Sequence, residues 1–167
     1  DNMANADAHG PDRLYEAELA MKRDGTIVSL RYQVIDDYGA YLQSGYGTHA
    51  NALAQVVGPY RINSVEARII AVLSNKCQQG AFRGFGAEVS NFVIERMVDA
   101  AAKELGIDPI EIRRRNLIRP EEFPYVIPTG NLYDSGNYQA VLAEALRMFD
   151  MEGWRAKQTE ARKEGRH

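Results

Sequence analysis

Alternating apolar and polar positions in the first quarter of the chain predict a β-hairpin. Residues 14–21 form a plausible strand, and residues 26–41 are rich in Val, Ile, Leu and Tyr, as long strands are. The dipeptide Asp24-Gly25 lies between the two runs and favours a tight hairpin turn. Gly39, inside the second run, predicts a bulge or a bend. The pattern therefore indicates a pair of antiparallel strands.

A third strand is predicted after a polar segment. Residues 45–58 are small and polar, and a short helix is expected over residues 50–57 before Pro59 ends it. In residues 62–73, apolar side chains alternate with Glu66 and Arg68. Such alternation is typical of a strand with one buried face.

The strongest helical pattern covers residues 87–105. Its apolar members recur at helical spacing, and they are Val89, Phe92, Val93, Met97, Ala100, Ala101 and Leu105. Gly106 follows directly, where a glycine commonly ends a helix. We expect the face centred on Phe92, Val93 and Met97 to cover the sheet.

A second helix is predicted directly afterwards. Asp108 can cap it, Pro109 suits its first turn, and Glu111 stands where a capping box requires an acid. The helix ends in three arginines at residues 113–115. Cations at a helix C-terminus complement its dipole, so we expect surface or packing roles for them rather than phosphate binding.

The last third of the chain predicts a loop and further helices. Residues 123–137 contain Pro and Gly breakers, and Asn137 can cap a helix over residues 138–148. The charged tail is helical in pattern, with Trp154 as its expected anchor. The predicted fold class is α+β, with an antiparallel hairpin and a further strand packed by several helices.

Composition narrows the functional classes. The chain has 167 residues, of which 45% are hydrophobic and 26% charged, with a net charge of −3. This charge gives no electrostatic case for binding nucleic acid, and no apolar run is long enough to span a membrane. Cys77 is the only cysteine, so we expect no disulfide framework and a reducing, cytoplasmic location. His9, His49 and His167 lack metal-ligand spacing, so no metal ligands are expected.

The segment with the most chemical content is residues 80–86, with the sequence GAFRGFG. Three glycines let the backbone adopt positive φ and approach another molecule closely. The N-terminus of the following helix attracts anions and electron-rich oxygen. The segment is therefore either a ligand cradle or an ordinary glycine-rich turn with a solvated Arg83. Its glycine spacing fits neither the P-loop nor the dinucleotide fingerprint.

The same segment, with two that follow it, resembles the large subunit of the xanthine oxidase family of molybdenum hydroxylases. The segments are GAFRGFG at residues 80–86, NFVIERMVD at 91–99 and ELGIDPIEIRRRNLI at 104–118. PTG at 128–130 and YDSGNY at 133–138 resemble the bacterial members, which include aldehyde, xanthine and carbon monoxide dehydrogenases. The resemblance extends from the hairpin to about Met148.

The resemblance implies a segment of a molybdenum-dependent enzyme. Such enzymes oxidise an aldehyde or an aromatic N-heterocycle with water-derived oxygen and pass electrons to iron–sulfur clusters and FAD. The expected cofactor is molybdopterin in its cytosine dinucleotide form, with 2Fe-2S clusters and FAD in other subunits or domains. The expected partners are the rest of the large subunit, the iron–sulfur and FAD subunits and a small-molecule substrate. We expect residues 1–150 to be a partial molybdopterin-binding domain of a longer polypeptide and residues 151–167 to be a connecting tail.

The site residues are assigned through the resemblance. Ala81, Phe82, Arg83 and Gly84 match positions that line the molybdenum centre. Phe85 matches an aromatic residue that stacks on substrate in purine-oxidising members, and its alternative role is core packing. The family's catalytic glutamate lies in a motif absent here, so no catalytic residue is assigned and this chain alone is expected to be inactive. Glu95 is expected to be structural.

Three departures from the family pattern limit the substrate. Asn51, with His49 nearby, occupies the position where purine oxidisers carry a substrate-orienting arginine, which disfavours xanthine. Gly84–Gly86 stands where carbon monoxide oxidisers carry a cysteine, so copper–molybdenum chemistry is not expected. Gln78 replaces a proline often seen before the loop. The alternative function is a non-catalytic scaffold or interaction module that keeps the fold.

Overall fold

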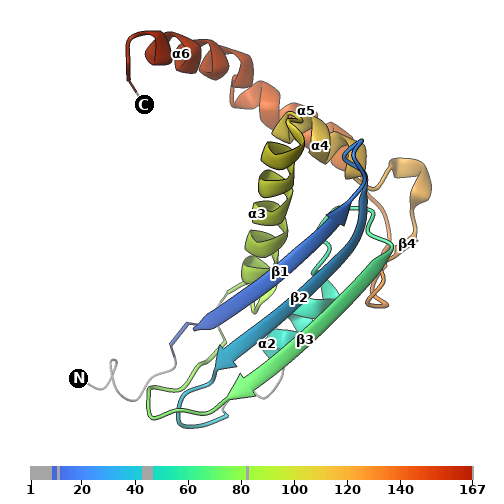
Figure 1. The fold of residues 1–167 in the computed structure, drawn as a ribbon. Helices are drawn as coiled ribbons and strands as arrows, with labels where there is room; N and C mark the ends of the chain where they lie inside the picture. Colours follow the sequence, from blue (N-terminus) through green and yellow to red (C-terminus); the bar gives the residue numbers. More distant parts are fainter. Residues whose placement is uncertain (1–8, 11, 43–46, 82, 167) are drawn as a thin grey trace.

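The computed structural model describes residues 9–10, 12–42, 47–81 and 83–166. Its centre is a three-stranded sheet of β1 (Arg13–Met21), β2 (Ile27–Asp37) and β3 (Ser64–Val72), in that order. The β1–β2 pair is antiparallel, as the hairpin pattern predicts, and β3 runs parallel to β2. Figure 1 shows the sheet with α2 and α3 behind it in that view.

The second strand ends earlier than the sequence predicts. It stops at Asp37, and Gly39 follows in a turn with φ 73°. A Cβ at Gly39 would lie 2.2 Å from the carbonyl oxygen of Cys77. Gly39 therefore marks a bend just beyond the strand, where only glycine lets the backbone of residue 77 come so close.

One face of the sheet holds the core. Along β2, the side chains of Leu30, Tyr32 and Val34 are buried, while the alternate positions face outward. They belong to a single cluster of buried apolar side chains, which also includes Ile94 and Val98 of α3. This arrangement of sheet and helices confirms the α+β class.

The helices begin and end close to their predicted positions. Gly106 ends α3 with φ 65°, and the Asp108 side chain accepts hydrogen bonds from the backbone N–H groups of Ile110 and Glu111. The segment predicted as a helix over 50–57 begins earlier, as α2. The bounds are α2 (Gly47–Ala54), α3 (Ala87–Leu105) and α4 (Pro109–Asn116).

The prediction of which face of α3 is buried is wrong. Phe92, expected at its centre, is 68% exposed, and Val93 and Met97 are only half-buried. The buried positions are instead Ser90, Ile94, Val98 and Ala102. Apolar side chains surround most of this helix, so its periodicity allows two neighbouring stripes, and packing against the sheet selects the other one.

Two polar side chains, Asn116 and Arg113, fix α4 to the rest of the fold. Asn116 is buried, accepts from the backbone N–H of Ile27 at 2.8 Å, and donates to the carbonyl of Gly25 at 2.7 Å. Arg113 pairs with Glu95 and Asp99 of α3. The first of the three predicted arginines therefore has a packing role, as expected.

The C-terminal part has more structure than the predicted loop. Within residues 123–137 the chain forms a small two-stranded sheet, and Asn137 caps α5 through the backbone N–H of Ala140. Trp154 anchors α6 to α5 by stacking on Phe149, with 6.0 Å between ring centroids. The elements are η1 (Pro120–Glu122), β4 (Tyr125–Val126), β5 (Leu132–Tyr133), α5 (Tyr138–Met148) and α6 (Met151–Lys163). No helix within the described residues has the length and apolar character to cross a membrane.

Candidate functional site

The glycine-rich segment ends in a left-handed turn directly before α3. Gly84, Phe85 and Gly86 have φ angles of 104°, 50° and 102°. A left-handed conformation is rare outside glycine and costs of order 1–3 kcal/mol at Phe85. Such strain persists only where neighbouring groups hold the turn, so its contacts define the site.

Packing inside this chain requires a glycine at residue 86 and crowds a Cβ at residue 84. A Cβ at Gly86 would lie 2.2 Å from the backbone oxygen of Thr48 in α2. A Cβ at Gly84 would lie 2.3 Å from a carboxylate oxygen of Glu88, the end of a flexible side chain. The sequence predicts that these glycines let the backbone come close to another molecule. In the structure they let it come close to other parts of this chain.

Side chains of α2 and α3 hold the turn. The amide nitrogen of Asn51 donates to the carbonyl oxygens of Gly84 at 3.1 Å and Phe85 at 3.0 Å. The backbone N–H of Gly86 donates to Glu88 at 2.9 Å. The N-terminus of α3 therefore carries its own carboxylate, which takes up one of the N–H groups that would otherwise face a ligand.

The start of the segment is held by backbone hydrogen bonds. Gln79 donates its N–H to the carbonyl of Tyr38 at 2.9 Å, and Gly80 donates to the carbonyl of His9 at 3.0 Å. Both Gln79 and Gly80 are buried. The segment therefore leaves the fold from a fixed point.

A buried carboxylate lies beside this fixed point. Asp36, at the end of β2, is fully buried and accepts from Nε2 of Gln79 at 2.6 Å and from Nε of Arg13 at 2.8 Å. Nε2 of His49 lies 2.8 Å from the same carboxylate. Burial alone would raise the pKa of Asp36, but the close His49 ring and the charge and hydrogen bond of Arg13 outweigh it, so this pKa lies below its usual range. The sequence analysis missed this cluster.

Three of the four predicted cofactor-binding residues can be placed, and all three are exposed. Ala81, Arg83 and Gly84 are exposed, and Phe82 lies outside the described residues. Phe85 is 36% exposed, and its ring lies against the backbone of Gly47 at the start of α2. Phe85 is therefore a partly exposed ring at the site's edge and not a core residue.

The other candidate residues have roles within the fold. Glu95 accepts from the hydroxyl of Tyr60 at 2.7 Å and pairs with Arg113. His49 contacts Asp36 inside the protein, whereas Asn51 contacts the turn. His49 therefore lies near the start of residues 80–86, and Asn51 lies near their end.

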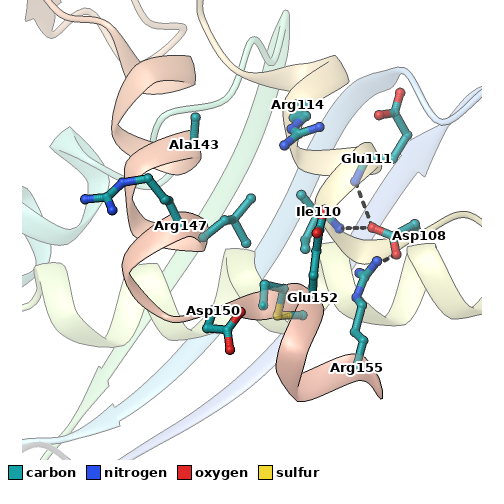
Figure 2. Close-up of a pocket in the computed structure, with 11 residues that line it drawn as sticks. Asp108, Ile110, Glu111, Arg114, Ala143, Arg147, Asp150, Glu152 and Arg155 are labelled. Atoms are coloured by element: carbon teal, nitrogen blue, oxygen red, sulfur yellow. Dashed lines mark hydrogen bonds and ion pairs between the residues drawn. The ribbon is translucent and has the colours of Figure 1, made fainter. Parts of the chain in front are cut away.

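A pocket of about 550 Å³ lies elsewhere, between the ends of α4, α5 and α6 (Figure 2). Its lining carries charges of both signs, including Arg114, Arg147 and Glu152. Asp108 uses its carboxylate on its own helix N-terminus and on Arg155. The pocket is a groove between helix ends that shares no lining residue with residues 80–86. Among the described residues, no cluster of His, Cys, Asp and Glu could hold a metal ion.

Comparison with known proteins relates the chain to molybdenum enzymes. The carbon monoxide dehydrogenase large chain of Hydrogenophaga pseudoflava is 37% identical over 159 residues, which are 93% of this chain and 20% of the relative. The nicotine 6-hydroxylase large subunit of Paenarthrobacter nicotinovorans is 31% identical over 166 residues, which are 97% of this chain and 20% of the relative. The chain therefore spans about a fifth of the length of these relatives.

The fold agrees with a solved structure of the same kind. Quinoline 2-oxidoreductase from Pseudomonas putida 86 superposes with a TM-score of 0.89 at 34% identity, over 98% of this chain and 21% of that one. The family model described as molybdopterin cofactor-binding domain matches residues 1–117. The chain therefore belongs to the molybdopterin cofactor-binding domain family.

Proposed function

We propose that the intact protein is a molybdopterin-dependent oxidoreductase that oxidises an aldehyde or an aromatic N-heterocycle with water-derived oxygen. In this proposal, the described chain forms one wall of the cofactor site. The observation that carries it is the strained turn at residues 84–86, which is exposed at Gly84 and Phe85 and anchored at both ends, in a chain of this family. Strained backbone of this kind clusters at binding and catalytic sites.

The described residues fit a group that lies on the outside of the turn. Ala81, Arg83 and Gly84 are exposed, whereas Gly80 and Gly86 on either side are buried. The segment thus offers open backbone between two fixed ends. Ala81, Phe82, Arg83 and Gly84 would hold the cofactor, chiefly through backbone groups and the charge of Arg83. When bound, the molybdenum centre supplies two-electron redox chemistry and activates water-derived oxygen.

The chain's own contribution is placement rather than proton transfer. Asp36, the buried carboxylate beside the segment, is used by Arg13, His49 and Gln79. Glu88 and Glu95 are engaged with Gly86 and Arg113. No carboxylate near the turn is left for general-base work among the described residues, so we propose that this chain is inactive without the rest of the protein.

Three observations favour an aromatic N-heterocycle or an aldehyde over carbon monoxide. Phe85 presents a partly exposed ring beside the proposed cofactor wall, where an aromatic substrate can stack. The turn lacks the cysteine expected of carbon monoxide oxidisers, and Cys77, the only cysteine, lies before the segment. Two similar proteins are named for quinoline and nicotine, whose rings are of this class.

The relatives' names support partner subunits in general. These relatives are large chains or subunits, so we propose that this chain works with the rest of a large subunit and with iron–sulfur and FAD subunits, in the cytoplasm. Exposed apolar side chains of α5, Val141 and Met148, and Phe149 just after it offer surface for such contacts. We further propose a cytosine dinucleotide form of the cofactor and a connecting role for residues 151–167.

The alternative is a scaffold that keeps the fold without the chemistry. One observation favours it: packing against the backbone of Thr48 accounts for Gly86, so this glycine would be kept without a cofactor. Exposure of Ala81, Arg83 and Phe85 favours the enzyme, since a scaffold has no need of an open wall there.

The test is metal analysis of the intact protein combined with a substrate screen. We expect stoichiometric molybdenum and pterin, and reduction of a dye acceptor with quinoline-type heterocycles or aldehydes but not with carbon monoxide. A folded, intact protein that carries neither molybdenum nor pterin would establish the scaffold instead.

A further inference from the structure

Asn51 makes the contact between α2 and the left-handed turn. Its amide nitrogen donates to two successive carbonyl oxygens, those of Gly84 at 3.1 Å and Phe85 at 3.0 Å. Its own carbonyl oxygen accepts from Gln55 at 3.1 Å, one helical turn further along. Every hydrogen-bonding atom of the Asn51 amide is therefore engaged, with Gln55 setting its orientation.

The platform that carries Asn51 is itself fixed. His49, two residues earlier, contacts the buried Asp36 carboxylate at 2.8 Å. One residue later, the carbonyl of Ala52 accepts from the hydroxyl of Ser90 in α3 at 3.1 Å. Because α2 is held in place, the hydrogen bonds from Asn51 determine where the carbonyl groups of Gly84 and Phe85 lie.

The turn needs this support because of Phe85. With φ 50°, its backbone conformation is unfavourable for a residue with a Cβ. The Asn51 amide bonds to its carbonyl and to the preceding one, the two groups that the left-handed conformation brings to the same side.

We propose that Asn51 is a positioning residue: it holds the strained turn so that Phe85 and the backbone of Gly84 face cofactor and substrate. This inference rests on the function proposed above. It assigns Asn51 a role through the loop rather than on the substrate, because its two N–H donors are already used by protein carbonyls.

The decisive variant is Asn51→Asp in the intact protein. A carboxylate has the same shape, donates nothing and repels the two carbonyl oxygens. We expect hydrogen exchange at the amides of Gly86 and Ala87 to become about tenfold faster, the effect of roughly one or two lost hydrogen bonds. We also expect KM for an aromatic substrate to rise by a larger factor than kcat falls.

The matched control is Asn131→Asp. The Asn131 amide also donates to a backbone carbonyl of α2, that of Ala54 at 3.2 Å, but it does not touch the turn. This control is expected to leave exchange at residues 86–87 and KM unchanged. If Asn51→Asp matches it in both measurements, Asn51 has no positioning role.

A second variant covers failure to fold. Asn51→Ser keeps one donor, and we expect the same changes with smaller size; a folded Asn51→Ser with wild-type exchange would overturn the proposal. Amide hydrogen exchange does not depend on enzyme activity, so it tests the role of Asn51 separately from the proposed function. An intact wild-type protein without molybdenum defeats the proposed function, whereas unchanged exchange in the Asn51 variants defeats this inference.

Discussion

At the scale of single residues, the candidate site is decided by backbone conformation. Phe85 adopts a left-handed conformation that glycine would take without strain, and it is held there by Asn51 and by packing of its ring on Gly47. The sequence motif indicates a flexible cradle. In the structure the segment ends in a hydrogen-bonded turn, in which a Cβ at Gly86 would meet the backbone oxygen of Thr48 and a Cβ at Gly84 would meet the side chain of Glu88.

The two glycines should respond differently to substitution. Gly84→Val is expected to abolish turnover with a modest fall in Tm, because its new Cβ meets only the movable end of Glu88. Gly86→Val is expected to lower Tm far more, because its Cβ meets the backbone oxygen of Thr48. Both variants also bear a positive φ, which costs of order 1–3 kcal/mol.

Thermal unfolding and steady-state turnover of the intact protein measure both effects. Near-normal turnover in Gly84→Val contradicts a cradle role for the turn. Equal losses of Tm in the two variants contradict the packing argument.

At the scale of elements, turn and capping residues in the sequence correctly predicted where helices and strands end. The Asp24-Gly25 turn, Gly106 and the Asp108 cap fix element ends, and the structure confirms them. The inner face of α3 is set by contacts distant in sequence, so periodicity alone chose Phe92 wrongly. The short strands β4 and β5 carry too few residues for a pattern.

The Asp36 cluster was predictable in part. Leu30, Tyr32 and Val34 point inward, and Asp36 continues the same alternation. A charged residue at an inward position signals a buried partner. What the sequence does not contain is the identity of those partners, since Arg13, His49 and Gln79 come from three separate segments.

Asp36 also makes a prediction about pH. Its pKa is lowered in the folded protein, so its stabilising contribution is present above its unfolded pKa and is lost as pH falls below about 4. Asp36→Asn is expected to lower the free energy of unfolding at pH 7 by about 3–5 kcal/mol, because Arg13 loses its buried partner. The variant should also show a smaller loss of stability between pH 7 and pH 3.

Urea unfolding of the intact protein at both pH values checks this. The exposed Asp134, changed to Asn, is the control, and it should behave like the wild type. A variant at Asp36 that keeps the full pH dependence would show that other carboxylates cause the loss at low pH.

At the scale of the whole molecule, we propose that the chain is one part of a larger site. The chain spans about a fifth of the length of its relatives, and among its described residues Glu88 and Glu95 near the turn already have partners within the fold. The resemblance predicted the family from the motifs at residues 80–118, and the family model confirms it. The roles of residues 81–85 stay predictions, because the cofactor and substrate that would contact them are not part of this chain.

The decisive measurement is a structure of the intact protein with its cofactor bound. We expect the backbone of residues 81–84 to lie against the molybdenum centre, with the Phe85 ring on the substrate side and Asn51 bonded to the turn. A cofactor bound far from residues 81–85 would contradict it.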